Sequence, residues 1–448
     1  MKINPGIFKS YDIRGIYPNE LNEQDAYNVA RFFIEYTGAK KVVVGCDSRL
    51  SSPILLQSLI RGLTEQGADV FNLDQVPIEV VYFTVGKFNY DAGIIVTASH
   101  NPKEYNGFKM VKKDKDKLEW IRGIDLLGIT EKNEFSVPKK TGKVKEINVW
   151  KDFQRHIFSF VDIEKIKPLK VVIDASNGVA GRAINSFKEK LPINIIPLNF
   201  EPDGNFPNHP PNPLLEESSE QISQVIKESK ADLGVIFDGD GDRIFLVDEK
   251  SNFTKGDISL LLLAKYFLTK GPGSVVVYNL ICSKAVPEFI KKWGGKPIRR
   301  PVGFVNIREG MMKENGAMGG EVSGHYCFRD NYYCDSGMIA FLIFLQIISE
   351  SGKKVSELLK EFSIYAKESE INFEIKDKEK VLEAVEQNYS DGKQDYLDGV
   401  TIEYENWWFN VRPSNTEPIV RLTIEAESKN LLTEKIKEIS DLIKKTAG

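Results

Sequence analysis

The sequence has little of what marks secreted or membrane-spanning chains. Only four cysteines occur in 448 residues, none in a CxxC pair. This fits a reducing compartment better than a disulfide scaffold, although Cys327 and Cys334 lie close enough in sequence to pair. The longest apolar runs, 258–263 and 338–345, are far too short to span a bilayer and predict buried helices. Residues 1–5 lack the apolar core of a signal peptide, so we expect a cytoplasmic protein with no membrane partner.

An excess of either charge is also missing, because 60 Lys and Arg residues stand against 64 Asp and Glu and give a net charge of −4. This balance argues against a nucleic-acid-binding surface. With 42% hydrophobic and 28% charged residues, the composition is that of an ordinary globular protein. A chain of 448 residues is too long for one compact core and predicts three or four domains.

Strand-like apolar runs alternate with helical stretches through most of the chain, which predicts parallel or mixed sheets covered by helices. The clearest strand and helix pairs are 41–45 with 52–65, 170–174 with 181–190, and 274–278 with 283–292. Beyond about residue 362 the pattern changes to a helix (378–386), three strands (400–404, 407–411 and 419–426) and a closing helix (431–444).

We therefore predict an α/β protein in which three successive mixed-sheet α/β domains surround a central cleft and a C-terminal α+β domain follows. A polar, lysine-rich run at 131–148 indicates the first boundary, and a second is expected near 248–252. The predicted domains are 1–145, 146–249, 250–362 and 363–448.

The most informative segment is the turn at 238–243, where Asp238, Asp240 and Asp242 alternate with glycines and Arg243 follows. The apolar runs on either side read as short buried strands. The glycines let the backbone bend so that the three carboxylates converge, and such crowded acids repel one another unless a cation lies among them. Oxygen ligands without sulfur or imidazole favour Mg²⁺, with Ca²⁺ or Mn²⁺ as substitutes.

Three other interpretations of this turn remain open at this point. An EF-hand loop would match the aspartates and Glu249, but it needs glycine where Arg243 stands and helices where strands are expected. In an aspartyl phosphatase, an acid that follows a buried strand attacks phosphate itself, and Asp238 would be that nucleophile. The third interpretation is a solvated acidic turn without a ligand.

A second motif, Thr-Ala-Ser-His-Asn-Pro at 97–102, follows a strand-like apolar run. Loops after the carboxyl ends of strands are where α/β proteins place reactive groups. Ser99 is therefore a candidate nucleophile or phosphoryl carrier, with Lys109 to neutralise the charge that it handles, or else a serine that only caps a turn. We do not expect His100 to serve as its base, because adjacent side chains point apart.

These motifs occur in the same order as in the α-D-phosphohexomutases, together with Tyr-Asn-Gly-Phe-Lys at 105–109, Gly-Glu-Val-Ser-Gly-His at 320–325 and Arg-Pro-Ser-Asn-Thr-Glu-Pro at 412–418. The chain resembles the phosphomannomutase/phosphoglucomutase branch of that family over essentially its whole length. The resemblance implies that Ser99 carries a phosphoryl group and binds Mg²⁺ together with the three aspartates. It thereby favours the serine over the aspartates as the nucleophile.

The resemblance also implies which residues hold the substrate. The matching positions are, in chain order, Tyr11, Arg14, Glu321, Ser323, Arg412, Ser414, Asn415 and Thr416. The first two lie in the family's opening segment, the next two hold sugar hydroxyls, and the last four bind the phosphate that is not reacting. Arg421 lies just outside the last motif and is as consistent with a surface charge. His209, in a shared stretch at 202–209, is interpreted as architectural.

One position departs from the family pattern, because Phe304 stands where the mannose and glucose branch often has histidine. General acid–base work then falls to Lys109, Arg243 or His325. Lys109 can shuttle a proton only if burial near other cations lowers its pKa.

We therefore expect an isomerase that interconverts the 1-phosphate and 6-phosphate of mannose, glucose or both. Its partners are expected to be small sugar phosphates, its cofactor Mg²⁺ and its intermediate and activator a hexose 1,6-bisphosphate, in a monomer or dimer. Asn415, where phosphoglucosamine mutases usually have glycine, favours this function over that of a phosphoglucosamine mutase. An aspartyl phosphatase and a non-catalytic sugar-phosphate sensor are the remaining alternatives.

Overall fold

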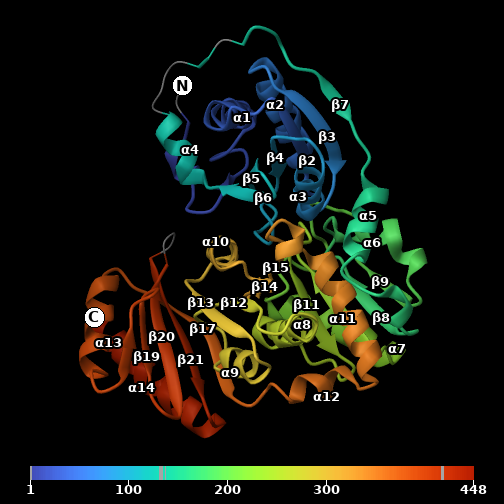
Figure 1. Ribbon diagram of the computed structural model, residues 1–448. Helices are drawn as coiled ribbons and strands as arrows, with labels where there is room; N and C mark the ends of the chain where they lie inside the picture. Colours follow the sequence, from blue (N-terminus) through green and yellow to red (C-terminus); the bar gives the residue numbers. More distant parts are fainter. Residues whose placement is uncertain (1–2, 131–134, 137, 415–417, 448) are drawn as a thin grey trace. The chain divides into compact units, whose positions relative to one another are not determined.

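The computed structural model of the chain describes residues 3–130, 135–136, 138–414 and 418–447 (Figure 1). It divides into two compact units. Unit 1 consists of Met1–Lys255 and Ser323–Ser356, and unit 2 of Gly256–Val322 and Glu357–Gly448. These units are larger than the four predicted domains, whose bounds stay a prediction.

The first sheet of unit 1 is mixed. Its strand order is β1-β5-β4-β2-β3-β7, with β6 beside β5. Strands β2, β3, β4 and β7 run parallel, whereas β5 is antiparallel to β1, β4 and β6. The strands are β1 (Ile13–Ile16), β2 (Lys41–Cys46), β3 (Asp69–Gln75), β4 (Ala92–Val96), β5 (Tyr105–Asp114), β6 (Lys117–Ile121) and β7 (Val144–Glu146). The helices are η1 (Pro5–Ile7), α1 (Glu23–Thr37), α2 (Ser52–Glu65), α3 (Ile78–Lys87) and α4 (Gly123–Thr130).

Strand β2 is buried on both faces of this sheet. Val42 and Val44 belong to the core that also contains apolar residues of α1 and α2. Successive strand residues point to opposite faces, and a Cβ at Gly45 would lie 3.4 Å from Val81 of α3. Burial on both faces explains why β2 reads as a nearly continuous apolar run. The predicted strand at 41–45 and helix at 52–65 are confirmed.

The second sheet of unit 1 has the order β11-β10-β8-β9, in which only β11 is antiparallel as far as the described residues go. Its strands are β8 (Lys170–Asp174), β9 (Asn194–Leu198), β10 (Leu233–Phe237) and β11 (Ile244–Asp248). The helices before and within it are α5 (Trp150–Phe158), η2 (Ile163–Lys165), α6 (Ala180–Phe187), η3 (Lys188–Lys190) and α7 (Glu216–Ser229). The later part of unit 1 adds β15 (Tyr326–Phe328), η4 (Arg329–Asn331), β16 (Cys334–Asp335) and α11 (Gly337–Ser351).

Unit 2 contains a parallel group with the order β13-β12-β14 and an antiparallel sheet with the order β17-β21-β20-β19-β18. The parallel group comprises α8 (Gly256–Lys270), β12 (Val275–Asn279), α9 (Ala285–Lys292), β13 (Lys296–Arg300), α10 (Phe304–Glu314) and β14 (Met318–Gly320). The antiparallel part comprises β17 (Ala366–Glu374), α13 (Lys378–Asn388), β18 (Lys393–Asp395), β19 (Val400–Glu403), β20 (Trp407–Pro413), β21 (Ile419–Ala426) and α14 (Lys429–Ala447). Helix α12 (Val355–Lys360) lies where the chain passes from unit 1 to unit 2.

Among the strands that the sequence analysis did not name, β7, β17 and β18 have sequences that hide their strand character. β7 forms within the polar run at 131–148 and pairs with β3, because backbone pairing at a sheet edge does not require apolar side chains. β18 is a short strand whose residues are all polar or charged. β17 has charged residues at 367, 368 and 370 and a change of register between Glu368 and Ile371, which hides its apolar alternation. The C-terminal α+β domain thus gains two sheet strands over those predicted.

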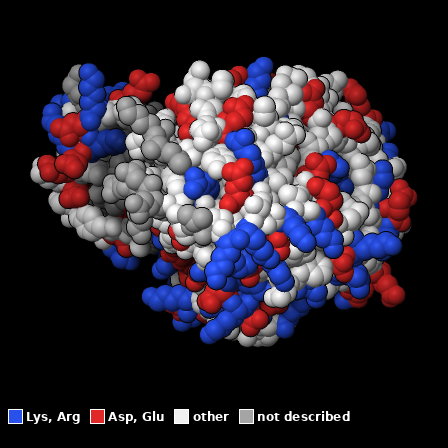
Figure 2. Space-filling model, turned by 90° about the horizontal axis from the view of Figure 1, so that it is seen from above, with Lys and Arg blue, Asp and Glu red and all other residues white. Residues whose placement is uncertain are grey.

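The distribution of charged, apolar and cysteine residues in the structure agrees with the composition of the chain. On the face shown in Figure 2, basic and acidic side chains are interspersed among uncharged ones. None of the helices in the described ranges combines the length and the apolar character that crossing a membrane requires. The apolar runs at 258–263 and 338–345 lie in the buried parts of α8 and α11, as predicted. All four cysteines are described and buried, and Cys327 and Cys334 are not joined by a disulfide.

Candidate active site

The acidic turn joins β10 and β11 of unit 1, as predicted. Gly241 has a φ of 79°, in the left-handed region that favours glycine. Asp238, Asp240 and Asp242 are at most 1% exposed. Each of them offers a carboxylate oxygen, and these oxygens lie within 4.8 Å of one another. The predicted convergence of the three carboxylates is confirmed, and the flanking strands exclude an EF-hand.

Ser99 lies beside this turn, in a segment at residues 97–105 that we call the serine loop. The loop follows β4, and Ser99 Oγ donates a hydrogen bond of 2.8 Å to Asp238 Oδ2. The backbone N–H of Ser99 donates to Thr97 Oγ1 at 2.9 Å. The prediction that the serine hydroxyl lies within reach of the acidic turn is therefore confirmed.

His100 lies closer to Ser99 than the sequence led us to expect. Its Nδ1 is 3.3 Å from Ser99 Oγ, so the expectation that the two side chains point apart is wrong. The reason is that Ser99 has a left-handed φ of 51°, which removes the alternation of side chains found in an extended strand. Burial, together with the positive charges of Arg243 and Arg14, lowers the pKa of His100 and keeps the imidazole neutral.

Lys109 extends from β5 into the acidic cluster. Its Nζ donates to Asp240 Oδ2 at 2.8 Å and to Asp242 Oδ2 at 2.7 Å. Burial opposes the ammonium charge, but Asp240, Asp242 and Asp238 raise the pKa of Lys109 above its usual value. This direction is the opposite of the lowered pKa that a proton shuttle needs, because the three carboxylates stabilise the charged ammonium group. Lys109 therefore keeps its proton and neutralises carboxylate charge.

The pKa values of Asp238 and Asp242 are shifted in opposite directions. Burial and the charges of Asp242 and Asp240 raise the pKa of Asp238. Burial also opposes ionisation of Asp242, but Lys109 and His325 lower its pKa. Asp240 Oδ1 is buried and has no hydrogen-bond partner among the described residues. A cluster of oxygen donors with an unsatisfied buried carboxylate oxygen fits a hard cation such as Mg²⁺.

Two further predicted residues, Ser323 and His325, adjoin the acidic turn within unit 1. Arg243 and His325 form an antiparallel backbone bridge, and Arg243 Nε donates to His325 Nε2 at 3.3 Å. The same Nε2 lies 3.4 Å from Asp242 Oδ1, and His325 Nδ1 lies 3.0 Å from Ser323 Oγ. Ser323 and His325 thus join the acidic turn and Ser99 in one cluster.

Of the two predicted residues near the N-terminus, Arg14 contacts the serine loop. Arg14 lies in β1, and its guanidinium donates to Asn101 Oδ1 and to Asp12. Tyr11 precedes β1, and its backbone carbonyl accepts a hydrogen bond of 2.5 Å from Trp120 Nε1. Substrate contact by the Tyr11 side chain stays a prediction.

Glu321 belongs to unit 2, where it is 3% exposed. Its Oε1 accepts hydrogen bonds from the Gly303 N–H at 2.8 Å and from Asn279 Nδ2 at 3.2 Å. Phe304 is the first residue of α10, directly after Gly303. Asn279 was not singled out in the sequence, although a polar residue at the carboxyl end of a buried strand is the signal that identifies such a position.

Arg412 is paired in register with another arginine on the neighbouring strand of the C-terminal sheet. Arg412 of β20 lies directly opposite Arg421 of β21, so Arg421 is not an isolated surface charge. Burial lowers the pKa of Arg412, whereas the ion pair with Glu370 opposes that effect. Ser414 is buried, and its carbonyl accepts a hydrogen bond of 2.6 Å from Lys378 Nζ. Asn415 and Thr416 lie outside the described residues.

Asp47 and Thr97 contact the site but were not among the site residues predicted from the sequence. Thr97 Oγ1 donates to Asp47 Oδ2 at 2.8 Å and lies 3.2 Å from Asp240 Oδ2. Asp47 directly follows β2, so its place after a buried strand is the signal that the sequence does contain.

Comparison with known proteins finds matching family models along most of the chain. The models are described as phosphoglucomutase/phosphomannomutase, alpha/beta/alpha domains I, II and III, and C-terminal domain. They match residues 5–121, 151–252, 255–365 and 370–442, respectively.

Individual relatives match over nearly the full length. A phosphomannomutase from Vibrio cholerae is 38% identical over 455 residues, which is 98% of each chain. A phosphomannomutase from Methanocaldococcus jannaschii is 39% identical over 451 residues, again 98% of each chain. A crystal structure of a phosphoglucomutase/phosphomannomutase family protein from Burkholderia thailandensis has a TM-score of 0.90 at 30% identity and covers 99% of this chain and 98% of that chain.

Proposed function

Because the chain belongs to the phosphoglucomutase/phosphomannomutase family, we propose that it interconverts hexose 1-phosphate and hexose 6-phosphate, with mannose and glucose as the sugars. The reaction runs through phosphorylated Ser99 and a hexose 1,6-bisphosphate, so the enzyme is an isomerase that performs two phosphoryl transfers. The observation that carries this proposal is the 2.8 Å hydrogen bond from Ser99 Oγ to Asp238 Oδ2 within a buried carboxylate cluster.

In the first transfer, a free hydroxyl oxygen of the sugar forms a bond to phosphorus while the bond from phosphorus to Ser99 Oγ breaks. In the second, the bisphosphate returns its other phosphoryl group to Ser99. Negative charge spreads over the transferring phosphoryl oxygens in both steps. Lys109 and Arg243 are fixed positive charges beside Ser99, and they offset that charge in a site from which water is largely excluded.

Asp238, Asp240 and Asp242, with an oxygen of phosphorylated Ser99, are the residues that would hold Mg²⁺. When bound, the ion supplies a Lewis acid for the phosphoryl oxygens.

The proton of the attacking hydroxyl needs an acceptor. A guanidinium group such as that of Arg243 offers only donors, and the carboxylates around Lys109 raise the pKa of that lysine. His325 and His100 are therefore better suited to proton transfer, since each has an imidazole nitrogen within the cluster and His100 is held neutral.

The enzyme must also bind the phosphate that is not reacting and the sugar ring of the substrate. Arg412, paired in register with Arg421, presents two guanidinium groups suited to the phosphate that is not reacting. The residues proposed to complete the substrate contacts are Tyr11, Arg14, Glu321, Ser323, Ser414, Asn415 and Thr416. A cytoplasmic location and a monomeric or dimeric state stay predictions from the sequence.

Replacement of Ser99 by alanine tests the central step. We expect Ser99→Ala to lose about 10⁴-fold or more of the turnover with a folded structure, because the phosphoryl carrier is gone. Ser186→Ala is the matched control, since within the described part of the chain that hydroxyl bonds only to a carbonyl of its own helix. Near-normal turnover by Ser99→Ala would eliminate this mechanism.

Two assays separate the alternatives. Mass mapping after incubation with glucose 1,6-bisphosphate should place a hydroxylamine-resistant phosphate on Ser99, whereas an acyl phosphate on Asp238 would indicate the phosphatase. Turnover of mannose 1-phosphate, glucose 1-phosphate and glucosamine 1-phosphate should then be compared side by side. A dominant rate with the amino sugar would overturn the assigned substrates.

A further inference from the structure

We propose that Arg49 is a positioning residue for phosphoryl transfer, which holds the serine loop in the conformation that presents Ser99 Oγ to the acidic turn. The inference rests on the proposed function and adds to it a residue that acts through the backbone. Arg49 follows β2 by three residues and lies behind the loop, bonded to carbonyl oxygens and not to the reacting hydroxyl.

The guanidinium of Arg49 is bonded to the serine loop over most of its length. Arg49 is 1% exposed. Its Nη1 donates to the carbonyls of Pro102 at 2.6 Å and Tyr105 at 3.0 Å, and its Nη2 to those of Ser99 at 2.8 Å and Asn101 at 2.6 Å. A guanidinium presents its donors in one rigid plane, so four bonds to one loop fix the relative positions of the four carbonyls.

Asp47 holds the guanidinium in place. Its Oδ2 accepts from Arg49 Nε at 3.1 Å, which compensates the buried positive charge. The same carboxylate accepts from Ser52 Oγ at 2.6 Å and from Thr97 Oγ1 at 2.8 Å. Asp47 therefore links Arg49 to the first residue of the serine loop as well as to helix α2.

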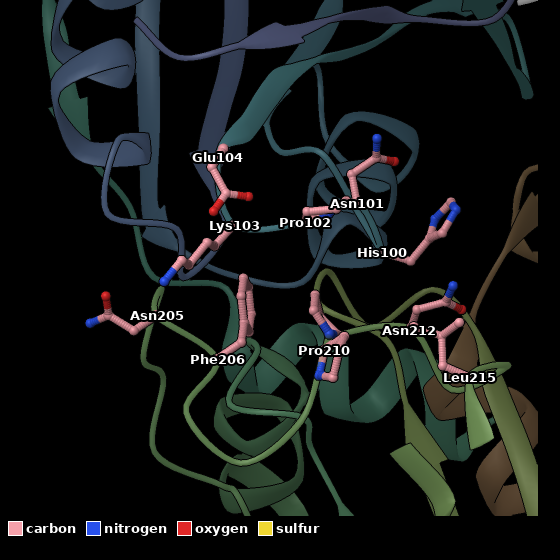
Figure 3. Close-up of a pocket in the computed structure, with 11 residues that line it drawn as sticks. His100, Asn101, Pro102, Lys103, Glu104, Asn205, Phe206, Pro210, Asn212 and Leu215 are labelled. Atoms are coloured by element: carbon pink, nitrogen blue, oxygen red, sulfur yellow. The ribbon is translucent and has the colours of Figure 1, made fainter. Parts of the chain in front are cut away.

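The serine loop needs such an anchor for two reasons. Ser99 has a left-handed φ of 51°, and a serine stays in this sparsely populated region only where its surroundings fix it. The outer side of the loop is not packed against a core, because a cavity of about 510 Å³ lies there. Figure 3 shows His100, Asn101 and Pro102 on one side of this cavity and Phe206 and Pro210 on the other.

Loss of the Arg49 guanidinium should therefore release the serine loop without removing a substrate contact. A displacement of about 1 Å at a reacting group lowers the rate about 10²-fold. Because Arg49 is not proposed to touch substrate, kcat should fall much more than KM changes.

The experiment compares Arg49→Lys with Leu63→Ala. Lysine keeps the positive charge but lacks the planar guanidinium group. Leu63 is a fully buried residue of the core that contains Val42 and Val44 of β2, and its replacement controls for general loss of stability. For Arg49→Lys we expect kcat to fall about 10²-fold with KM within about threefold of the wild type. Hydrogen exchange should accelerate in residues 97–105 and not elsewhere. Leu63→Ala should lower the Tm and retain kcat below it.

Unchanged kcat and unchanged exchange at 97–105 in Arg49→Lys would overturn the proposal. So would activity lost only in proportion to the unfolded fraction, with exchange accelerated throughout the unit. If Arg49→Lys does not fold, Asp47→Asn tests the proposal instead. We expect this variant to show the same accelerated hydrogen exchange in residues 97–105 and a loss in kcat of about tenfold, because Arg49 is less well oriented. A wild-type enzyme that isomerises no sugar phosphate refutes the proposed function, whereas local exchange still decides whether Arg49 holds the loop.

Discussion

Replacing Gly239 by alanine tests how closely the serine loop packs against the acidic turn. A Cβ added at Gly239 would lie 2.6 Å from the backbone oxygen of Ser99 and 3.2 Å from Pro211 Cβ. Neither neighbour can move away by rotating a flexible side chain. Because ordinary contact begins at about 3.4 Å, the loop and the turn must separate by about 0.8 Å.

That separation should lower both the stability of the protein and its kcat. Overpacking of this kind destabilises a folded protein by about 1–3 kcal/mol. The 2.8 Å hydrogen bond from Ser99 Oγ to Asp238 Oδ2 would lengthen past the normal range. A shift of nearly 1 Å at the phosphoryl carrier should lower kcat by about 10²-fold.

The assay measures kcat with a sugar phosphate and thermal unfolding for the wild type, Gly239→Ala and a control. Gly128→Ala serves as the control, because Gly128 lies in α4 and nothing among the described residues lies within 4 Å of an added Cβ. The control should keep full activity and gain about 0.5–1 kcal/mol in stability. Wild-type activity and Tm in Gly239→Ala would refute the close packing on which this reasoning depends.

Three other outcomes concern pH, substrate and metal. Burial opposes the charge of His209, but the hydrogen bond and charge of Asp174 raise its pKa above about 6.5. The stabilisation of the folded state by the His209–Asp174 interaction is full below about pH 6.5 and is lost as pH rises through the folded-state pKa of His209. In urea unfolding, the loss of unfolding free energy caused by His209→Gln should therefore shrink toward alkaline pH. A pH-independent deficit would contradict it. Arg421→Ala should raise KM about tenfold with little change in kcat, since it removes one charged contact to phosphate; an unchanged KM would exclude that contact. Chelation should abolish turnover, and added Mg²⁺ should restore it and raise the Tm, with both responses weakened in Asp240→Asn; a response equal to that of the wild type would remove Asp240 from the metal site.

The pairing of Ser99 with the acidic turn could be predicted from the sequence because both segments directly follow buried strands. Apolar runs such as 233–237 are recognisable without the fold, and the carboxyl ends of such strands carry the reactive groups. The resemblance to a family then joined two motifs that lie 139 residues apart.

The electrostatic state of Lys109 could not be predicted in the same way. Its pKa depends on carboxylates 131 and 133 residues further along the chain, at distances that only the fold determines. The contact of His100 with Ser99 depends on a positive φ at serine, which no side-chain pattern indicates. Arg421 opposes Arg412 because of the register of β20 and β21, and register is a property of the folded sheet.

The return of residues Ser323–Ser356 to unit 1 has a consequence for synthesis on the ribosome. Ring centroids of Phe341 in α11 and Phe237 at the end of β10 lie 6.3 Å apart, and Glu79 of α3 accepts a hydrogen bond of 3.3 Å from the Met338 N–H. A nascent chain that ends at residue 255 lacks these partners, so Phe237 and Glu79 stay exposed to water until α11 emerges. Unit 1 therefore cannot complete its core while it is being translated in order, and a chaperone has an exposed apolar surface to bind during that interval.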